Sequence, residues 1–501
     1  MQNRTRWSAL LALTVFYPTL ALGSGFYVAR FGGSHGHGAT DNVTAVYYNP
    51  AGLALGADTR LHIEGIFAWR EFTYDRPADA ISKVIGPNDR GVGTPEEFVT
   101  GDCTQSNHCP NHGKATLSNT LASPFIGLAT DFGVEGLGVG LAVFGPLGGK
   151  SVFDRQSARA SDEVLTGAAD GPQRWWSIEG TIQSAYIAAS VAYHLKDYNL
   201  AIGLSLNAVL STVDTVRAKT SPNNDNIVNR VPVTGLNGEE SYVDRPYEGR
   251  SYVQNASALE PALGLGVMYM PIPEVRVGVS YQSSPNFGAS VLEGDSYILF
   301  GETEFDNPER QESRPKVKVY QHMPDVFNWG IVFQPDPTYA LRVFGNYVLW
   351  SRFTEQCVSK DIPSAIDGSA LSDSGVCNTN DERNLIAITR NWDDGYNIRL
   401  AGSYWPLAEL ELIGDLGYDS NAVPDEYLEP ALFDTTKYTL GLGAHYEVVS
   451  RLRLGLMYTQ VFYDDRTVES GVSRSEPNSA GTYTQAIGVT NVSVEYSFSA
   501  F

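Results

Sequence analysis

Apolar and polar side chains alternate along many short segments of this chain. In the last of these segments Val492, Val494 and Tyr496 share one face, while Asn491 and Ser493 lie on the other. A period of two residues is typical of a β-strand whose two faces meet different surroundings. The second face is mostly small or polar rather than charged, which suits a barrel with a lipid-facing outside and a polar lumen. We therefore predict an all-β, antiparallel transmembrane β-barrel.

Short and long connections alternate between the predicted strands, and together they join fourteen strands. Outer-membrane barrels have an even number of strands, short periplasmic turns and long outer loops, so this count and this alternation agree with each other. The short turns lie near residues 131–136, 197–199, 271–274, 335–338, 406–408 and 448–450, and the long inserts lie near 75–116, 155–177, 219–252, 293–313, 356–391, 423–435 and 467–482.

The first residues resemble an export signal. Arg4 and Arg6 precede an apolar run from Ala9 to Leu22, so we predict a signal peptide at residues 1–23 and a mature start near Ser24. A membrane anchor is the alternative, but the run is short and contains Pro18. No later stretch approaches the roughly twenty apolar residues of a spanning helix. We expect a location in the outer membrane of a Gram-negative bacterium.

Residues 24–58 lack the alternation and are rich in glycine. A disordered leader is the alternative, but Phe31, Val46, Tyr47 and Leu53 make the segment too apolar for a solvated tail. We expect residues 24–58 to fold into the lumen as a plug, or hatch, and residues 59–501 to form the barrel.

Composition narrows the possible partners. The formal net charge of -22 excludes nucleic acid, because nothing would neutralise its phosphates. The 27 Tyr, 21 Phe and 8 Trp suit the aromatic girdles of a membrane barrel.

All four cysteines lie in polar inserts. In an oxidising compartment two disulfides that staple loops are favoured over a metal site, and we predict the pairs Cys103 with Cys109 and Cys357 with Cys377.

Short motifs follow one another over nearly the whole chain. They are Ser24-Gly25-Phe26, Asn49-Pro50-Ala51-Gly52, Pro146-Leu147-Gly148, Leu204-Ser205-Leu206-Asn207-Ala208, Gly278-Val279-Ser280-Tyr281, Met323-Pro324-Asp325, Trp350-Ser351-Arg352-Phe353 and Gly395-Tyr396-Asn397. In this order they resemble the FadL/TodX-type outer-membrane transporters of long-chain fatty acids and other hydrophobic compounds.

The resemblance implies a fourteen-stranded barrel with a hatch that ends in the motif Asn49, Pro50, Ala51 and Gly52. It also implies a long-chain fatty acid or other hydrophobic small molecule that binds near the outer loops, contacts Phe26, passes the hatch and leaves sideways through the wall. The expected partners are this solute, outer-membrane lipid and the barrel-assembly machinery. We expect a monomer without a cofactor.

The strand predicted between residues 137 and 154 offers a sideways route. Pro146 cannot donate a hydrogen bond to a neighbouring strand, and glycines on either side weaken the strand further. Pro146, Leu147 and Gly148 are therefore expected to mark a kink and an opening in the wall. The alternative is a bulge near a loop that has no role in transport.

An anionic head group calls for a cation at the mouth of the binding pocket. The resemblance places Arg217 at a substrate-contacting position and Arg390 near a second one. Either residue could instead be an outer-loop arginine paired with a carboxylate. If the solute is neutral, neither charge is required.

Other functions are less well supported by the sequence. An outer-membrane lipase would need a Ser/His pair with an orienting partner, and we do not expect an enzyme. His35 and His37 have the spacing of a metal-binding pair, but glycines surround them and no third ligand is evident, so we expect no metal site. A porin for polar solutes and an adhesin or receptor barrel without transport activity remain as alternatives.

Overall fold

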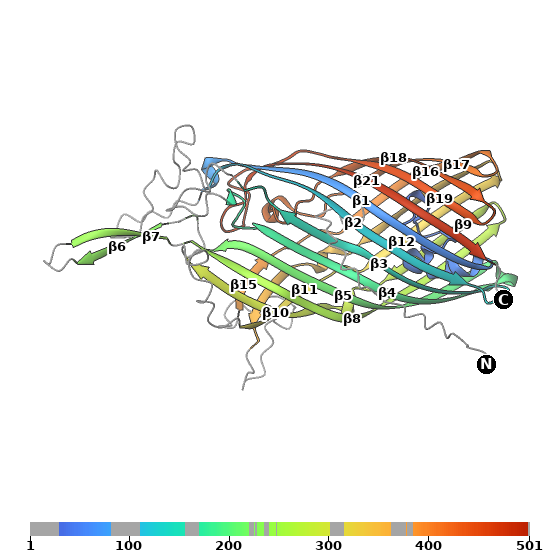
Figure 1. Cartoon of the computed structure of the whole chain (residues 1–501), viewed down its shortest axis with the longest axis horizontal. Coiled ribbons are helices and arrows are strands. Elements are labelled where there is room, and N and C mark those ends of the chain that lie inside the picture. Colours follow the sequence, from blue (N-terminus) through green and yellow to red (C-terminus); the bar gives the residue numbers. More distant parts are fainter. Residues whose placement is uncertain are drawn as a thin grey trace, which may run out of the picture.

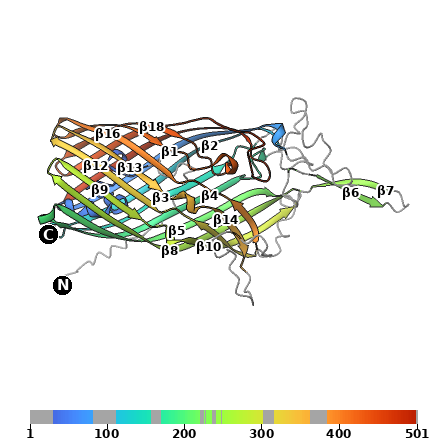
Figure 2. The ribbon, with the colours of Figure 1, turned by 180° about the vertical axis from the view of Figure 1, so that it is seen from behind.

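The computed structural model describes residues 30–81, 111–155, 170–219, 225, 228–234, 240–246, 248–300, 315–361, 377 and 384–498. Its strands form one closed barrel, and the short β6–β7 hairpin projects beyond one end of it (Figures 1 and 2). No helix in these ranges is long and apolar enough to cross a membrane.

The barrel is built mainly from long strands, with short helical turns between some of them. The strands are β1 (Thr59–Arg76), β2 (Gly113–Thr130), β3 (Leu137–Val152), β4 (Glu179–Leu195), β5 (Leu200–Lys219), β6 (Val228–Thr234), β7 (Glu240–Pro246), β8 (Gly249–Ile272), β9 (Val275–Gln282), β10 (Ala289–Phe300), β11 (Lys316–His322), β12 (Val326–Asp336), β13 (Tyr339–Val348), β14 (Glu355–Lys360), β15 (Asn384–Thr389), β16 (Gly395–Leu407), β17 (Leu410–Asp419), β18 (Lys437–Val449), β19 (Leu452–Tyr463), β20 (Arg466–Val468) and β21 (Gly481–Phe498). The helical turns are η1 (Gly33–His35), α1 (Ala45–Tyr48), η2 (Pro50–Leu55), η3 (Ala78–Ala80), η5 (Lys196–Tyr198), η6 (Pro285–Phe287), η8 (Trp350–Arg352) and η9 (Asp425–Tyr427).

Antiparallel pairing closes the barrel between its first and last strands. β1 pairs with β2 on one side and with β21 on the other, so no edge strand is left between them. Five wall strands are each broken once, into β9 and β10, β11 and β12, β13 and β14, β15 and β16, and β19 and β20. Counted in this way, the described chain forms fourteen antiparallel wall strands, which confirms the sequence prediction.

The expected extent of some long inserts is wrong. Residues 293–300 belong to β10, and β14 and β15 lie within the insert expected at 356–391. β10 follows a break at Pro285, β14 follows a break at Trp350, and β15 precedes the break at residues 390–394, so the alternating pattern is interrupted and resembles a polar loop.

The alternation has the predicted physical basis. In β16 the side chains of Ile398 and Leu400 are exposed on the outside, whereas Asn397 and Arg399 are buried inside the barrel. Apolar side chains thus face lipid and polar ones face the lumen, as in other membrane barrels.

Exposed tyrosines mark two levels on the outer surface. The pairs Tyr339 and Tyr347, Tyr396 and Tyr404, and Tyr438 and Tyr446 are each eight residues apart on one strand. At about 3.3 Å per residue this spacing is about 26 Å along the strand, which at a tilt of about 35–45° is about 20 Å of height, comparable with the roughly 25 Å apolar band of such barrels. The tyrosines therefore form the two girdles that the composition predicts.

Candidate functional site

The N-terminal segment, residues 30–58, lies inside the barrel near the end with the short turns (Figure 1). Its side chains Phe31, Val43, Tyr47 and Leu53 share one buried apolar cluster with lumen-facing residues such as Phe125. Phe31 and Phe125 have ring centroids 5.3 Å apart. The segment therefore fills the lumen at this level.

Asn49 links two parts of this segment to each other and to the wall. The side chain is fully buried, and its amide Nδ2 donates to the carbonyls of Gly38 at 2.6 Å and Val267 at 3.1 Å. Its Oδ1 accepts from the backbone N–H of Ala51 at 3.1 Å and thereby caps η2. Pro50 follows at the first position of η2, where a missing N–H is tolerated.

A row of small residues on neighbouring strands receives the segment. Gly138, Ala192, Gly203 and Gly266 are register partners across β3, β4, β5 and β8. A Cβ atom added at any of these glycines would overlap with residues 49–54 of the segment. The close fit requires glycine because the backbone of the segment occupies the space next to Gly138 and Gly203, and the side chains of Asn49 and Pro50 occupy the space next to Gly266.

Polar contacts hold the opposite side of the segment. Ser34 donates to Asp415 Oδ2 at 2.5 Å, and His35 Nε2 lies 2.9 Å from Glu411 Oε1. His445 also contacts Glu411, at 3.2 Å. Burial, followed by the nearby Arg342 guanidinium, lowers the pKa of His35 to about 4.

The same cluster brings together three potential metal ligands. Ligand atoms of His35, Glu411 and His445 lie within 4.8 Å of one another, so two potential ligands that the sequence did not reveal join His35. However, Arg342 and Arg453 also form ion pairs with Glu411, so its charge is already balanced by cations. His37 lies apart, with its ring stacked on Phe344 at 4.9 Å.

Acidification is expected to weaken docking of the N-terminal segment. An unperturbed histidine has a pKa of about 6.5, so the undocked segment binds a proton at a pH where docked His35 does not. The contribution of neutral His35 to the free energy of docking is therefore fully present above about pH 6.5, and it is lost as the pH falls towards 4. His37 acts in the same direction, because burial and Arg342 also lower its pKa.

Hydrogen exchange of residues 30–58, corrected for intrinsic rates, measures this effect between pH 4.5 and 7. The double variant His35→Gln and His37→Gln should lose most of the pH dependence. Equal protection of the native segment at both pH values would contradict the expectation.

An apolar cavity lies in the outer half of the barrel. Its walls come from β4, β5, β8, β11, β14 and β15 and include Ile182, Val213, Val253, Val319, Val358, Ile386 and Ile388. Gly149 and Ser151 of β3 complete one side of the cavity.

Arg217 and Arg390 both line this cavity, as does Glu429. Arg390 forms an ion pair with Glu429, and its Nη2 donates to Gln356 Oε1 at 3.1 Å. No carboxylate of the described residues forms an ion pair with Arg217, although Glu429 is its nearest opposite charge. The cavity therefore carries one more cation than anion, and Arg217 supplies that excess.

Backbone pairing between β2 and β3 is interrupted over part of their length. The two strands pair from Phe125 and Phe144 towards their turn, and they meet again where the N–H of Asp154 donates to the carbonyl of Thr116 at 2.9 Å. Between these points, residues 117–124 pair only with β1 and residues 145–152 pair only with β4. We call these two stretches the window.

Side chains span the window where backbone pairing is missing. The Ser123 hydroxyl donates to the carbonyl of Gly145, and the Asn119 amide donates to the carbonyl of Lys150, both at 2.9 Å. A bulge between Phe144 and Leu147 begins the interruption. The structure therefore places the predicted residues Pro146, Leu147 and Gly148 at the inner edge of the window.

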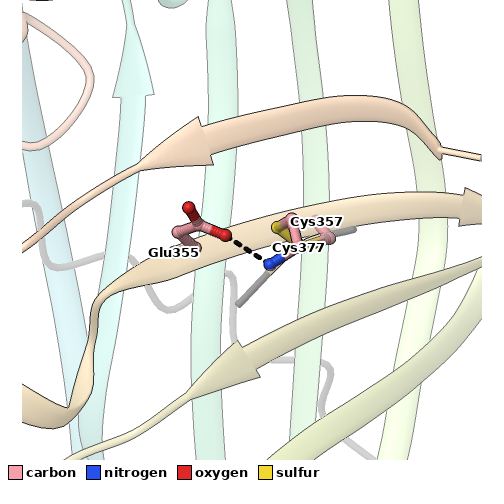
Figure 3. Close-up of a disulfide and its surroundings, with 3 residues drawn as sticks. All are labelled: Glu355, Cys357 and Cys377. Carbon is pink, nitrogen blue, oxygen red and sulfur yellow. Dashed lines mark hydrogen bonds between the residues drawn. A yellow bond between two sulfur atoms is a disulfide. The ribbon is translucent and has the colours of Figure 1, made fainter. Parts of the chain in front are cut away.

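The cysteine pair in the outer half is joined. Cys357 of β14 and Cys377 form a disulfide with Cα atoms 5.9 Å apart, and the backbone N–H of Cys377 donates to Glu355 (Figure 3). Cys103, Cys109 and Phe26 lie outside the described residues, as does the expected signal peptide.

Sequence reasoning missed several residues at the cavity and the window. Glu429 lies in an insert and Asn119 in a strand, and neither belongs to a motif. The period-two pattern placed Gly203 on the lumen face but could not indicate what it contacts.

Comparison with known proteins agrees with this geometry. The family described as "Outer membrane protein transport protein (OMPP1/FadL/TodX)" matches residues 28–498. No curated protein sequence matches the chain significantly.

Solved structures of low sequence identity share the fold. A Pseudomonas aeruginosa FadL homologue has a TM-score of 0.66 at 14% identity, with 95% of this chain and 98% of that chain covered. The Ralstonia pickettii toluene transporter TbuX has a TM-score of 0.57 at 18% identity, with coverage of 95% and 98%. The P. putida toluene transporter TodX has a TM-score of 0.56 at 11% identity, with coverage of 91% and 94%.

Proposed function

Because the chain belongs to the outer-membrane transport protein family of FadL and TodX, we propose that it takes up amphipathic hydrophobic molecules by a sideways route. The solute is captured in the outer cavity, the N-terminal segment acts as a hatch that rearranges, and the solute leaves through the window into the membrane. Residues 24–58 would form this hatch and residues 59–501 the barrel.

One observation carries the proposal, namely the contact between cavity and window. Gly149 and Ser151 line the apolar cavity and belong to the stretch of β3 that lacks pairing with β2. Exposing apolar surface to water costs about 25 cal/mol per Å², so a hydrophobic solute gains from a short path between an apolar cavity and lipid.

The charge of the cavity supports an anionic head group. Arg217 provides a cation that Glu429 does not neutralise, because Glu429 is paired with Arg390. A long-chain carboxylate would place its head at Arg217 and its tail along the valine and isoleucine walls. TbuX and TodX are described as toluene transporters, so a neutral aromatic compound is the second candidate.

The filled lumen argues against the porin alternative. Fully buried side chains of residues 30–58 pack against the wall around the inner half of the barrel, so no straight aqueous path is favoured. An adhesin would have no need for an apolar cavity beside an unpaired stretch of wall.

Uptake by cells that lack their own hydrophobic channels tests the proposal. Expression of the full chain should support uptake of radiolabelled oleate, while liposomes that contain the protein should not swell with arabinose. Swelling without oleate uptake would favour a porin, and neither activity would favour a barrel without transport function.

The substitution Arg217→Gln is expected to weaken oleate binding by about tenfold, since hydrogen bonds to charged groups contribute about 1.5–3 kcal/mol. Titration calorimetry of the purified protein measures the change. The affinity for uncharged methyl oleate should stay within about twofold if the guanidinium binds the carboxylate. Equal losses for both ligands would show that Arg217 only shapes the cavity.

A further inference from the structure

Arg70 is a buried cation whose terminal nitrogens have no hydrogen-bond partner among the residues that the structure describes. Its side chain on β1 is 1% exposed, and its Nε donates to Gln485 Oε1 at 2.7 Å. Neither Nη1 nor Nη2 has a hydrogen-bond partner among the described residues. Burying an unpaired charge is costly, so a purely structural role does not explain why an arginine occupies this position.

Other unsatisfied donors lie beside this guanidinium. Gln485 Nε2 and the Tyr463 hydroxyl are buried, and neither forms a hydrogen bond of good geometry with a described residue. Tyr463 lies near both Arg70 and Gln485. The group therefore offers several N–H and O–H donors and a positive charge, which matches the two oxygens of a carboxylate.

Apolar side chains surround the Arg70 group on both sides. Along the same face of β1, Ala68 belongs to the cluster around the N-terminal segment and Phe72 belongs to the cluster of the outer half. The guanidinium carbon lies 5.2 Å from the centre of the Phe72 ring. An acyl chain would thus find apolar surface next to the cation.

Arg70 also lies next to the window. Its register partner on β2 is Asn119, whose amide spans the window to the carbonyl of Lys150 on β3. The next residue on β3, Ser151, lines the outer cavity. Neighbouring strands are about 4.8 Å apart, so the backbone of Arg70 lies on the order of 10 Å from the cavity wall.

We propose that Arg70, with Gln485 and Tyr463, forms a second head-group site for a carboxylate at the window, separate from the cavity site at Arg217. This site would bind the carboxylate head group while the tail enters the window, so that the carboxylate keeps hydrogen-bond donors in an otherwise apolar passage. The inference rests on the proposed function and adds a residue that selects amphipathic acids at the exit step.

The test uses the full-length protein, with Arg76 as the matched control. Arg76 is equally buried on the same face of β1, but it pairs with Asp225 at 2.7 Å and donates to the carbonyl of Asn111 at 2.9 Å. Arg70→Gln should leave the heat-unfolding temperature of the barrel unchanged or higher, whereas Arg76→Gln should lower it. A similar fall for both variants would mark Arg70 as a structural residue and overturn the proposal.

Uptake assays then distinguish the effect of the Arg70 charge from the effect of its side-chain shape. Arg70→Gln should lower oleate uptake by about tenfold, leave methyl oleate uptake unchanged and leave oleate binding in the cavity within about twofold. Arg70→Lys should restore most of the uptake, and Gln485→Glu should block it because the new carboxylate occupies the guanidinium.

Two further results would overturn the inference alone. The first is unchanged oleate uptake in Arg70→Gln, which would mean that water alone satisfies the Arg70 guanidinium. The second is an equal loss of oleate and methyl oleate uptake in this variant. If the native protein binds and transports neither compound, the proposed function fails, and this inference fails with it.

Discussion

A disulfide across the window, made by Asn119→Cys and Ser151→Cys, is expected to stop uptake of hydrophobic solutes. The Thr116–Asp154 hydrogen bond sets the register that places residues 119 and 151 opposite each other. Both face the lumen side of the barrel, and Asn119 already reaches the β3 backbone. A covalent link here would hold the strands together at the only place where β2 and β3, as described, lack pairing.

The expected result is a loss of oleate uptake of tenfold or more in the oxidised variant, with recovery after reduction. Because Ser151 lines the cavity, oleate binding is measured in both states, and binding that persists while uptake is lost assigns the loss to the exit step. The native protein under the same reductant controls for opening of the Cys357–Cys377 disulfide.

A second cross-link serves as the matched control. Ser184 and Ser211 are register partners in β4 and β5, where pairing is continuous, and their hydroxyls lie 3.0 Å apart. Ser184→Cys with Ser211→Cys should form a disulfide without changing uptake. Full uptake through the oxidised window variant would rule out lateral exit between β2 and β3.

The substitution Gly266→Val is expected to displace the N-terminal segment and open the lumen. A Cβ atom at this position would overlap with Asn49 Oδ1 and lie 3.0 Å from Pro50 Cδ. Overpacking costs about 1–3 kcal/mol, and each 1.4 kcal/mol changes an equilibrium tenfold. We therefore expect the undocked population to rise by roughly ten- to hundredfold, while valine supports the β8 strand itself.

Sensitivity of cells to a large hydrophobic antibiotic measures this opening, and hydrogen exchange of residues 30–58 confirms its cause. Gly402→Val is the matched control, because a Cβ there would meet Leu341 only at an ordinary 3.7 Å. A protected segment and unchanged sensitivity in Gly266→Val would show that the fit at this glycine is not needed for closure.

The sequence indicated the wall of the barrel well because each strand carries its own evidence. Alternating residues such as Ile398 and Arg399 must face lipid and lumen in turn, whatever the neighbouring strand is. The alternation failed where strands are broken, since a few irregular residues hide short strands such as β14 and β15. Pro146 predicted an interruption of the strand pairing, because proline has no backbone N–H to donate.

The sequence by itself therefore determined the barrel and its number of strands from local patterns, and the same patterns predicted an N-terminal segment inside the lumen and an interruption at Pro146. Only the tertiary structure decided which groups meet. Arg217 and Arg390 share a cavity, Glu429 pairs with one of them, and Gly266 faces Asn49. These contacts depend on strand register and on distances between residues far apart in the chain, which no local pattern encodes. The same holds for Arg70. That its terminal nitrogens have no hydrogen-bond partner among the described residues depends on what surrounds them in the folded protein.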